Sequence, residues 1–325
     1  MCVRAYFAAV LLFTAAVGFA ANVCAQSYPA KPIRLIVPYA PGGDTDIVAR
    51  HIAPKLSDTL KQQVIVDNRP GAGSLIGTEA MLRAPADGYT LAMGTISSLA
   101  VLPVTKTNVP YDPVKDIAPI SLITVVPYVL HVHPSIPART VAELVKLAKS
   151  RPGQMTYGTP GIATGVHLTT EYFSSVAGVK LVHVPYKGSA PLLVDIFAGN
   201  LSLVITTFAT TGPHIKSGRL RALAIAANAR AKDFADIPTM SESGYRGFEA
   251  STWHGVVTRA GVPKPIINRL NSDITRIVNT DDVRSALVSA GFDIGAGSAE
   301  DFERFVQSEI DKWKKVATVA HVRMD

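Results

Sequence analysis

The sequence predicts an α/β fold of two lobes, each a mainly parallel sheet flanked by helices, joined by a two-strand hinge. After a leader, short β-rich apolar runs alternate with segments of helical period, which is the rhythm of βαβ units. Two long extended runs, 117–133 and 219–227, bracket a central block of the same rhythm. A chain of 325 residues is also longer than most single domains, which favours two lobes.

The leader, residues 1–25, has the layout of a cleavable secretory signal. Arg4 precedes the apolar stretch AAVLLFTAAVGFA, and the segment ends in the small-residue motif VCA. A retained membrane anchor is the weaker interpretation because no basic flank follows the apolar run, and Val23 disfavours a lipid-modified Cys24. We therefore expect an exported protein. Its mature chain would contain no cysteine, since Cys2 and Cys24 both lie in the leader.

The first lobe begins with the apolar run IRLIV, which precedes a helix expected over 46–60. The run QVIVD then leads through a glycine loop into a helix over 76–84, and YTLAMG follows. The central block consists of RTVAELVKLAKS, MTYGTPG, GVHLTTEYFSSVAG, KLVHVPYKG and LSLVITT.

Two C-terminal helices are expected to cover the first lobe, because each has an apolar stripe. The stripes consist of Ile267, Leu270, Ile274 and Ile277, and of Phe302, Phe305, Ile310 and Trp313. This organisation assigns residues 26–123 plus 229–325 to the first lobe and 124–228 to the second. The cleft between the lobes becomes the expected ligand site.

The formal net charge of +7 arises from 32 Lys and Arg against 25 Asp and Glu, spread along the chain. No basic cluster with interleaved aromatic residues is present, so we expect no nucleic-acid partner. A diffuse positive field favours capture of small anions. Basic charge that only keeps an exported protein soluble explains the composition equally well.

The stretch PYAPGGDTDIVAR directly follows the first apolar run and suggests an anion-binding turn. Gly42 and Gly43 permit a close backbone approach, and Thr45 or Asp46 could cap the following helix, whose N-terminus favours negative charge. A carboxylate fits better than a phosphate, because the GxxxxGK[ST] spacing is absent. A simple capping turn is the alternative. Repetition favours a site, since NRPGAGS, MGTISS, YGTPGIATG, VPYKGSAP and TTFATTG each follow an apolar strand.

Signatures of enzymes and cofactors are absent from the sequence. GAGSLIG has one residue too many before its third glycine for a dinucleotide fingerprint, and neither GxSxG nor HExxH occurs. The pairs His131 with His133 and His167 with Glu171 supply only two ligands each, too few for a specific metal site. We therefore expect no cofactor, no metal and no catalytic residue.

The blocks PYAPGGDTDIVAR, VDNRPGAGSLIGTEAMLRAPADGYTLAMG, TYGTPGIATGVHLTTEYF, VHVPYKGSAPLLVDIFAGNL, RLRALAIAANARAKDFADIPTMSESGY and WHGVVTRAGVPKPIINRLN closely resemble the Bug-type (TctC-like) receptors of tripartite tricarboxylate transporters. The resemblance covers essentially the whole mature chain. It implies a monomeric, two-lobed periplasmic binding protein of type II-like fold. Such a protein closes on a small carboxylated solute (a dicarboxylate, an amino acid or an aromatic carboxylate) and presents it to the membrane permease subunits.

The resemblance also implies ligand-binding residues, with one carboxylate held by the first strand-to-helix loop and a second loop supplied by the opposite lobe. The first clamp would consist of Tyr39, Ala40, Gly43, Asp44, Thr45 and Asp46, with Gly73 and Ser74 nearby. The second would consist of Thr159, Gly161, Thr164 and His167, with Tyr186 and Lys187 at the side and Ser98 and Phe208 as further candidates.

Asp44 departs from the pattern of this family, whose loop usually has a small residue at that position. A carboxylate in the cleft would repel a dianion and could pair with the amine of an amino-acid-like ligand. We expect instead that Asp44 turns outward as a helix cap. Two other functions stay open for the whole chain: an exported α/β enzyme using Asp46 or His167 in acid–base catalysis, and a ligand sensor for a signalling system.

Overall fold

The structure, a computed structural model, describes residues 28–320 and 322–323, so the expected signal segment lies outside the described residues. Lys31–Asp325 forms one compact unit, to which the following description refers. Among the described residues, no helix combines the length and the apolar character needed to cross a membrane.

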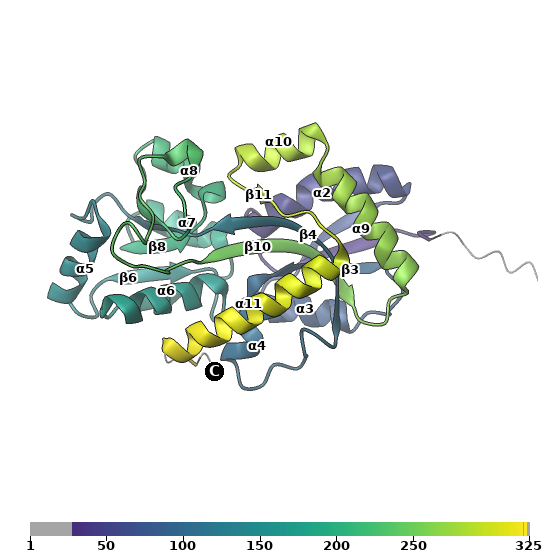
Figure 1. Cartoon of the computed structure of the whole chain (residues 1–325), viewed down its shortest axis with the longest axis horizontal. Helices are drawn as coiled ribbons and strands as arrows, with labels where there is room; N and C mark the ends of the chain where they lie inside the picture. Colours follow the sequence, from purple (N-terminus) through teal and green to yellow (C-terminus); the bar gives the residue numbers. More distant parts are fainter. Residues whose placement is uncertain (1–27, 321, 324–325) are drawn as a thin grey trace, which may run out of the picture. The chain divides into compact units, whose positions relative to one another are not determined.

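Two sheets organise this unit, one of six strands in the order β11-β4-β10-β3-β1-β2 and one of five in the order β7-β6-β8-β5-β9 (Figure 1). The strands are β1 (Ile33–Val37), β2 (Val64–Asn68), β3 (Thr90–Thr95), β4 (Ile117–Pro127), β5 (Val129–Val132), β6 (Thr156–Thr159), β7 (Val182–Pro185), β8 (Leu203–Thr206), β9 (Arg221–Ile225), β10 (Ser251–Arg259) and β11 (Asp293–Ile294).

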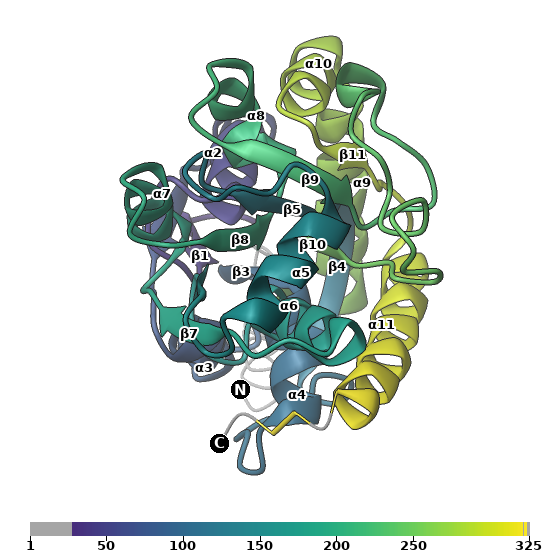
Figure 2. The same cartoon turned by 90° about the vertical axis from the view of Figure 1, so that its left-hand side faces the viewer.

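Helices cover both sheets. They are α2 (Asp44–Leu60), α3 (Leu75–Leu82), α4 (Leu102–Thr105), α5 (Val141–Ser150), α6 (Gly165–Ala177), α7 (Ser189–Phe197), α8 (Phe208–Lys216), α9 (Lys264–Val278), α10 (Asp281–Ser289) and α11 (Ala299–Val319), with short turns η1 (Ala72–Ser74), η2 (Ser97–Val101) and η3 (Lys232–Phe234). Figure 2 shows α2 and α9 on one face of the six-stranded sheet and α3 and α11 on the other. The C-terminal helices therefore return to the first sheet, as the sequence predicts.

The predicted fold class is confirmed, although both sheets are mixed and not mainly parallel. β1 pairs in parallel with β2 and β3, whereas β10 runs antiparallel to β3 and β4. In the second sheet, β6 pairs in parallel with β7 and β8, while β5 runs antiparallel to β8 and β9. The βαβ rhythm indicates the parallel pairs, but a long extended run contains no signal for the direction in which it joins a sheet.

The chain passes from one sheet to the other at Tyr128, which separates β4 from β5. The Tyr128 N–H donates to the carbonyl of Ala250 at 2.9 Å, and the Tyr128 carbonyl accepts from the Ala226 N–H at 2.8 Å. Ala226 follows β9 and Ala250 precedes β10, so the outgoing and returning segments are hydrogen-bonded side by side.

Helix α11 is fixed to the first sheet through a buried carboxylate. Glu309 accepts the indole N–H groups of Trp253, on β10, and of Trp313, on α11 itself, each at 3.0 Å. Both indoles are almost completely buried, so their donors have no access to water.

Replacing Glu309 with alanine is expected to lower the free energy of unfolding by about 2–4 kcal/mol, because two buried indole donors lose their acceptor. Urea denaturation of the purified protein measures the change. Lys312→Ala is the control: its ammonium group is 3.4 Å from Glu309 and partly exposed, so its loss should cost less than about 1 kcal/mol. Equal stability of Glu309→Ala and the wild type would contradict this account.

Candidate functional site

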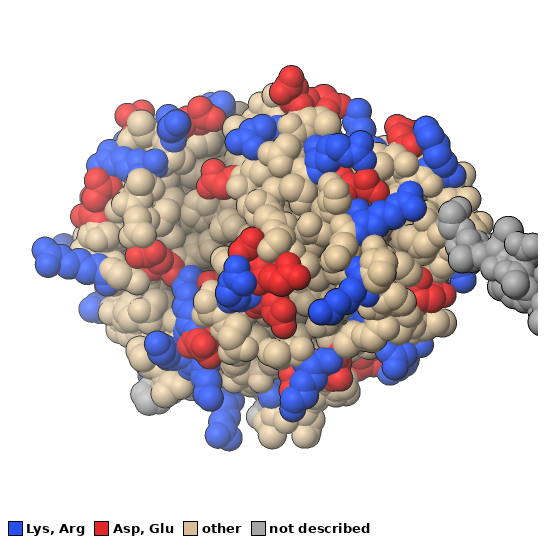
Figure 3. All heavy atoms as spheres, turned by 45° about the vertical axis from the view of Figure 1, so that its right-hand side comes forward, with Lys and Arg blue, Asp and Glu red and all other residues tan. Residues whose placement is uncertain are grey.

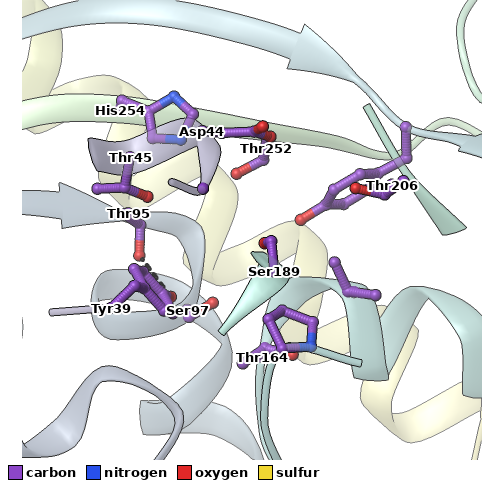
Figure 4. A pocket seen from close by; sticks show the side chains of 14 residues that line it. Tyr39, Asp44, Thr45, Thr95, Ser97, Thr164, Ser189, Thr206, Thr252 and His254 are labelled. Atoms are coloured by element: carbon purple, nitrogen blue, oxygen red, sulfur yellow. Dashed lines mark hydrogen bonds between the residues drawn. The ribbon is translucent and has the colours of Figure 1, made fainter. Parts of the chain in front are cut away.

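A cavity of about 50 Å³ lies where loops from the carboxyl ends of strands in both sheets meet. Its lining, seen from close by in Figure 4, consists of Tyr39, Gly43, Asp44, Thr45, Thr95, Ser97, Tyr128, Pro160, Thr164, Val166, Ser189, Thr206, Thr252 and His254. The carboxyl ends of strands are the expected position for a ligand site in an α/β fold.

The loop between β1 and α2 is held by Asp46. Its carboxylate accepts hydrogen bonds from the Gly42 N–H at 3.0 Å, from Arg50 Nε at 2.8 Å and from Asn68 Nδ2 at 2.9 Å. Burial alone would raise the pKa of Asp46, but these hydrogen bonds and the charge of Arg50 hold it below its ordinary value. Asp46 therefore supports the loop as an ionised anchor.

The capping expected of Thr45 or Asp46 was wrong. Gly43 occupies the N-cap position of α2 without any side-chain cap, and α2 begins one residue later, at Asp44. A small residue there brings the backbone to the edge of the cavity, which Gly43 and Thr45 line. The first N–H groups of a helix have no carbonyl partner within it, so this end of α2 favours an acceptor in the cavity.

Three further helices begin at the cavity. Thr164, the N-cap of α6, accepts the His167 N–H and lines the cavity. Ser189, the first residue of α7, also lines the cavity. Thr206 lies immediately before Thr207, the N-cap of α8. Converging helix N-termini and hydroxyl groups form an environment that favours an anion. No Lys or Arg is among the lining residues, so backbone and hydroxyl groups would bind it.

One side of the cavity is formed by Tyr39, Thr95 and Ser97. The Tyr39 hydroxyl lies 3.3 Å from Thr95 Oγ1, and burial raises the pKa of Tyr39, which keeps the phenol protonated. Ser97 Oγ accepts the Gly165 N–H at 3.1 Å. This hydrogen bond connects η2, which follows β3 of the six-stranded sheet, with the start of α6, which follows β6 of the five-stranded sheet.

Tyr128, between β4 and β5, and Thr252 and His254, on β10, complete the lining of the cavity. His254 Nδ1 lies 2.9 Å from Thr124 Oγ1, and burial lowers the pKa of His254 to about 3, so its ring is neutral at physiological pH. Burial likewise raises the pKa of Tyr128. Both side chains therefore present uncharged polar atoms to the cavity.

Asp44 does not turn outward as a cap, so that expectation was wrong. Its Oδ2 accepts a hydrogen bond from Thr207 Oγ1 at 2.8 Å. The bond joins the start of α2, which follows β1 in the six-stranded sheet, to the loop after β8, in the five-stranded sheet. Its Oδ1 is buried and has no hydrogen-bond partner among the described residues. Burial raises the pKa of Asp44 to about 6, and hydrogen bonds from Thr207 and from the backbone of Asp44 itself oppose part of that rise.

Loops that follow strands of the six-stranded sheet touch loops that follow strands of the five-stranded sheet. A Cβ atom added at Gly73 would lie 2.2 Å from the carbonyl oxygen of Ile162, and one added at Gly188 would lie 3.0 Å from Cβ of Ala40. The contact at Gly73 therefore leaves no room for a side chain, and the one at Gly188 leaves little.

The sequence-predicted residues fall into two groups. Those that line the cavity are Tyr39, Gly43, Asp44, Thr45 and Thr164. Those that do not line it are Ala40, Asp46, Gly73, Ser74, Ser98, Thr159, Gly161, His167, Tyr186, Lys187 and Phe208.

Several residues of the second group make hydrogen bonds or ring contacts within the protein. Ser98 Oγ accepts from the Thr95 N–H, and Thr159 Oγ1 lies 2.7 Å from His183 Nε2. His167 stacks on His183, with ring centroids 3.9 Å apart, and burial together with the charge of His183 lowers the pKa of His167 to about 3.

Three further candidates, Tyr186, Lys187 and Phe208, are also absent from the lining. The Tyr186 hydroxyl donates to Asp195, and Lys187 is exposed. Phe208 stacks on Phe234 at 4.1 Å within a hydrophobic cluster. A direct contact between any of these residues and a ligand stays a prediction.

The charged surface of the protein is mixed. On the face in view, Figure 3 shows Lys and Arg interspersed with Asp and Glu, without a continuous basic area. Within the described part of the chain, no group of three or more His, Cys, Asp or Glu residues is placed to hold a metal ion.

Comparison with known proteins identifies the family. Residues 48–321 match the tripartite tricarboxylate transporter family receptor, TctC. Protein BugT of Bordetella pertussis (strain Tohama I) is 38% identical over 306 residues, which are 94% of each chain. Rpa4515 of R. palustris, solved with adipate, has a TM-score of 0.88 at 35% identity, covering 91% of this chain and 99% of that one. MatC (Rpa3494) of Rhodopseudomonas palustris, solved with bound malate, has a TM-score of 0.86 at 27% identity, covering 89% of this chain and 99% of that one.

These similarities confirm the resemblance that the sequence motifs indicated, and they extend over nearly the whole chain. The family is one of solute-binding receptors and not of enzymes. The chain belongs to the tripartite tricarboxylate transporter receptor family, the TctC or Bug-type solute-binding receptors.

Proposed function

We propose that this protein captures a small carboxylated solute in the periplasm and delivers it to the membrane permease subunits of a tripartite tricarboxylate transporter. The observation that carries the proposal is the cavity itself, where four helices begin among hydroxyl groups and no lining Lys or Arg is present. Such a lining holds carboxylate oxygens through hydrogen bonds. Relatives solved with adipate and malate support a carboxylate, and the signal-like leader supports export.

Capture would couple to a movement of two lobes, residues 26–123 plus 229–325 and residues 124–228. The segment around Tyr128 is the proposed hinge, because the outgoing and returning chains are hydrogen-bonded side by side there, between the two sheets. A solute that contacts both lobes binds the closed form better than the open form and so shifts the population toward closure. The permease would then recognise the closed form.

Catalysis on the solute is disfavoured by the positions of the two candidate acid–base residues. The Asp46 carboxylate already accepts hydrogen bonds from Arg50, Asn68 and the Gly42 N–H. Neither Asp46 nor His167 lines the cavity. General acid–base groups need hydrogen-bonding reach of the reacting atom.

Thermal denaturation of the mature protein with a panel of dicarboxylates, amino acids and aromatic carboxylates tests the proposal. At least one member should raise the melting temperature, and chromatography should recover it chemically unchanged. Failure of the whole panel to shift the melting temperature would contradict a carboxylate receptor, and conversion of a ligand would indicate an enzyme.

A further inference from the structure

We propose that the solute carries a protonated amine as well as a carboxylate, and that Asp44 is the group that recognises the amine. This inference rests on the proposed function, because it takes the cavity to be the solute site. It narrows the solute class from carboxylates in general to compact zwitterions such as amino acids.

The first support is the half-satisfied carboxylate of Asp44. Oδ2 accepts from Thr207 Oγ1 at 2.8 Å, whereas Oδ1 is buried at the cavity without a partner among the described residues. A buried carboxylate oxygen without a donor is unfavourable, since it has lost its hydration without replacement. A donor from the solute would satisfy it.

The second support is the lack of a positive counter-charge from the protein. Among the residues that line the cavity, the only other titratable groups are Tyr39, Tyr128 and His254. The two phenols have raised pKa values and the imidazole a lowered one, so all three are uncharged at neutral pH. No lining side chain therefore offers Asp44 a positive charge, and an ammonium group of the solute would supply one.

The third support is the separation of two chemically different ends of the cavity. In Figure 4, Asp44 lies near Thr252 and His254, while Tyr39, Ser97 and Thr164 lie at the opposite end. The latter end includes the N-terminus of α6, which favours an anion. A zwitterion that spans the cavity would place its carboxylate there and its ammonium group at Asp44.

Calorimetric titration with matched pairs tests the inference at pH 7.5. The pairs are aspartate with succinate and glutamate with glutarate, which differ only in the amine. In the wild type the amine-bearing member should bind at least about tenfold more tightly, as expected for a charge-assisted hydrogen bond. Asp44→Asn should remove this preference by weakening the amino acid about ten- to a hundredfold, without weakening the dicarboxylate.

Asp233→Asn is the matched control, because it removes the same charge from an exposed position away from the cavity. It should keep the wild-type preference. Tighter binding of the dicarboxylates by the wild type, or equal losses for both ligands in Asp44→Asn, would overturn the inference while leaving a carboxylate receptor intact. If none of these four ligands binds to any variant, the inference is contradicted, and the wider panel described above decides the proposed function separately.

A titration at lower pH adds a readout that separates recognition from a structural role. Protonation of Asp44 removes its negative charge, so the ratio of wild-type to Asp44→Asn affinity for the amino acid should fall as the pH drops from 7.5 to 5. Succinate and glutarate take up a proton themselves in this range, so their affinities are also compared between the two variants at the same pH, and this ratio should rise. An amino-acid ratio that stays constant over this pH range would overturn the assignment.

Discussion

Gly73→Ala is expected to weaken solute binding about ten- to a hundredfold by preventing closure of the cleft. The new Cβ would lie 2.2 Å from the carbonyl oxygen of Ile162, on the opposite loop, and a backbone atom cannot rotate away. Relief requires the two loops to separate, at a cost typical of overpacking, about 1–3 kcal/mol. That cost falls on the closed form alone, so it appears directly in the dissociation constant. Calorimetry measures the affinity, and small-angle scattering measures whether saturating solute still compacts the protein.

The control for Gly73→Ala is Gly153→Ala. Both glycines have positive φ, +65° and +70°, so alanine strains the backbone comparably at each position. A Cβ at Gly153 meets nothing within 4 Å, however, so this variant should lose some stability and keep the wild-type affinity. Wild-type affinity and compaction in Gly73→Ala, or equal loss of affinity in both variants, would contradict the closure contact.

Asp44→Asn is expected to stabilise the protein without solute at neutral pH, although it weakens binding of an amine. The pKa of Asp44 is raised from 3.8 to about 6 by burial, with hydrogen bonds from Thr207 and from the backbone of Asp44 itself opposing the rise. A folded-state pKa above the unfolded value means that the relative stabilisation is complete below about pH 4 and is lost as the pH rises through 6. The loss amounts to at most about 3 kcal/mol at neutral pH, because one pKa unit corresponds to about 1.4 kcal/mol.

Melting temperatures between pH 4 and pH 8 test this stability profile. The variant should melt higher than the wild type at pH 7.5, and the difference should shrink toward pH 4, where Asp44 is protonated. Asp233→Asn, at an exposed site, should reproduce the wild-type profile. A variant that melts lower than the wild type at pH 7.5 would show that the Asp44 carboxylate is satisfied in the solute-free protein.

Local patterns predict much of this molecule. The run IRLIV is β1, the helix expected over 46–60 is α2, and the loops MGTISS, VPYKGSAP and TTFATTG contain Thr95, Ser97, Ser189 and Thr206 of the cavity. Each of these features depends on a strand followed by small residues and a helix, which is a signal within a few residues of sequence.

The remaining features depend on contacts between distant segments. Tyr128 lies between β4 and β5, and Thr252 and His254 lie on β10, where nothing in the local pattern separates a cavity residue from a core residue. The orientation of Asp44 depends on Thr207, 163 residues further along the chain. Phe208 was a ligand candidate from its loop, but Phe234 provides the aromatic surface on which it stacks. Tertiary contacts of this kind are not visible in one sequence.

The most direct test of a carboxylate receptor is a calorimetric comparison of the best-binding solute with its primary amide. The amide keeps nearly the same size and shape but has lost the negative charge that the helix N-termini and hydroxyl groups are arranged to hold. The account predicts one solute per protein and at least about tenfold weaker binding of the amide. Equal affinity of the acid and its amide would contradict it.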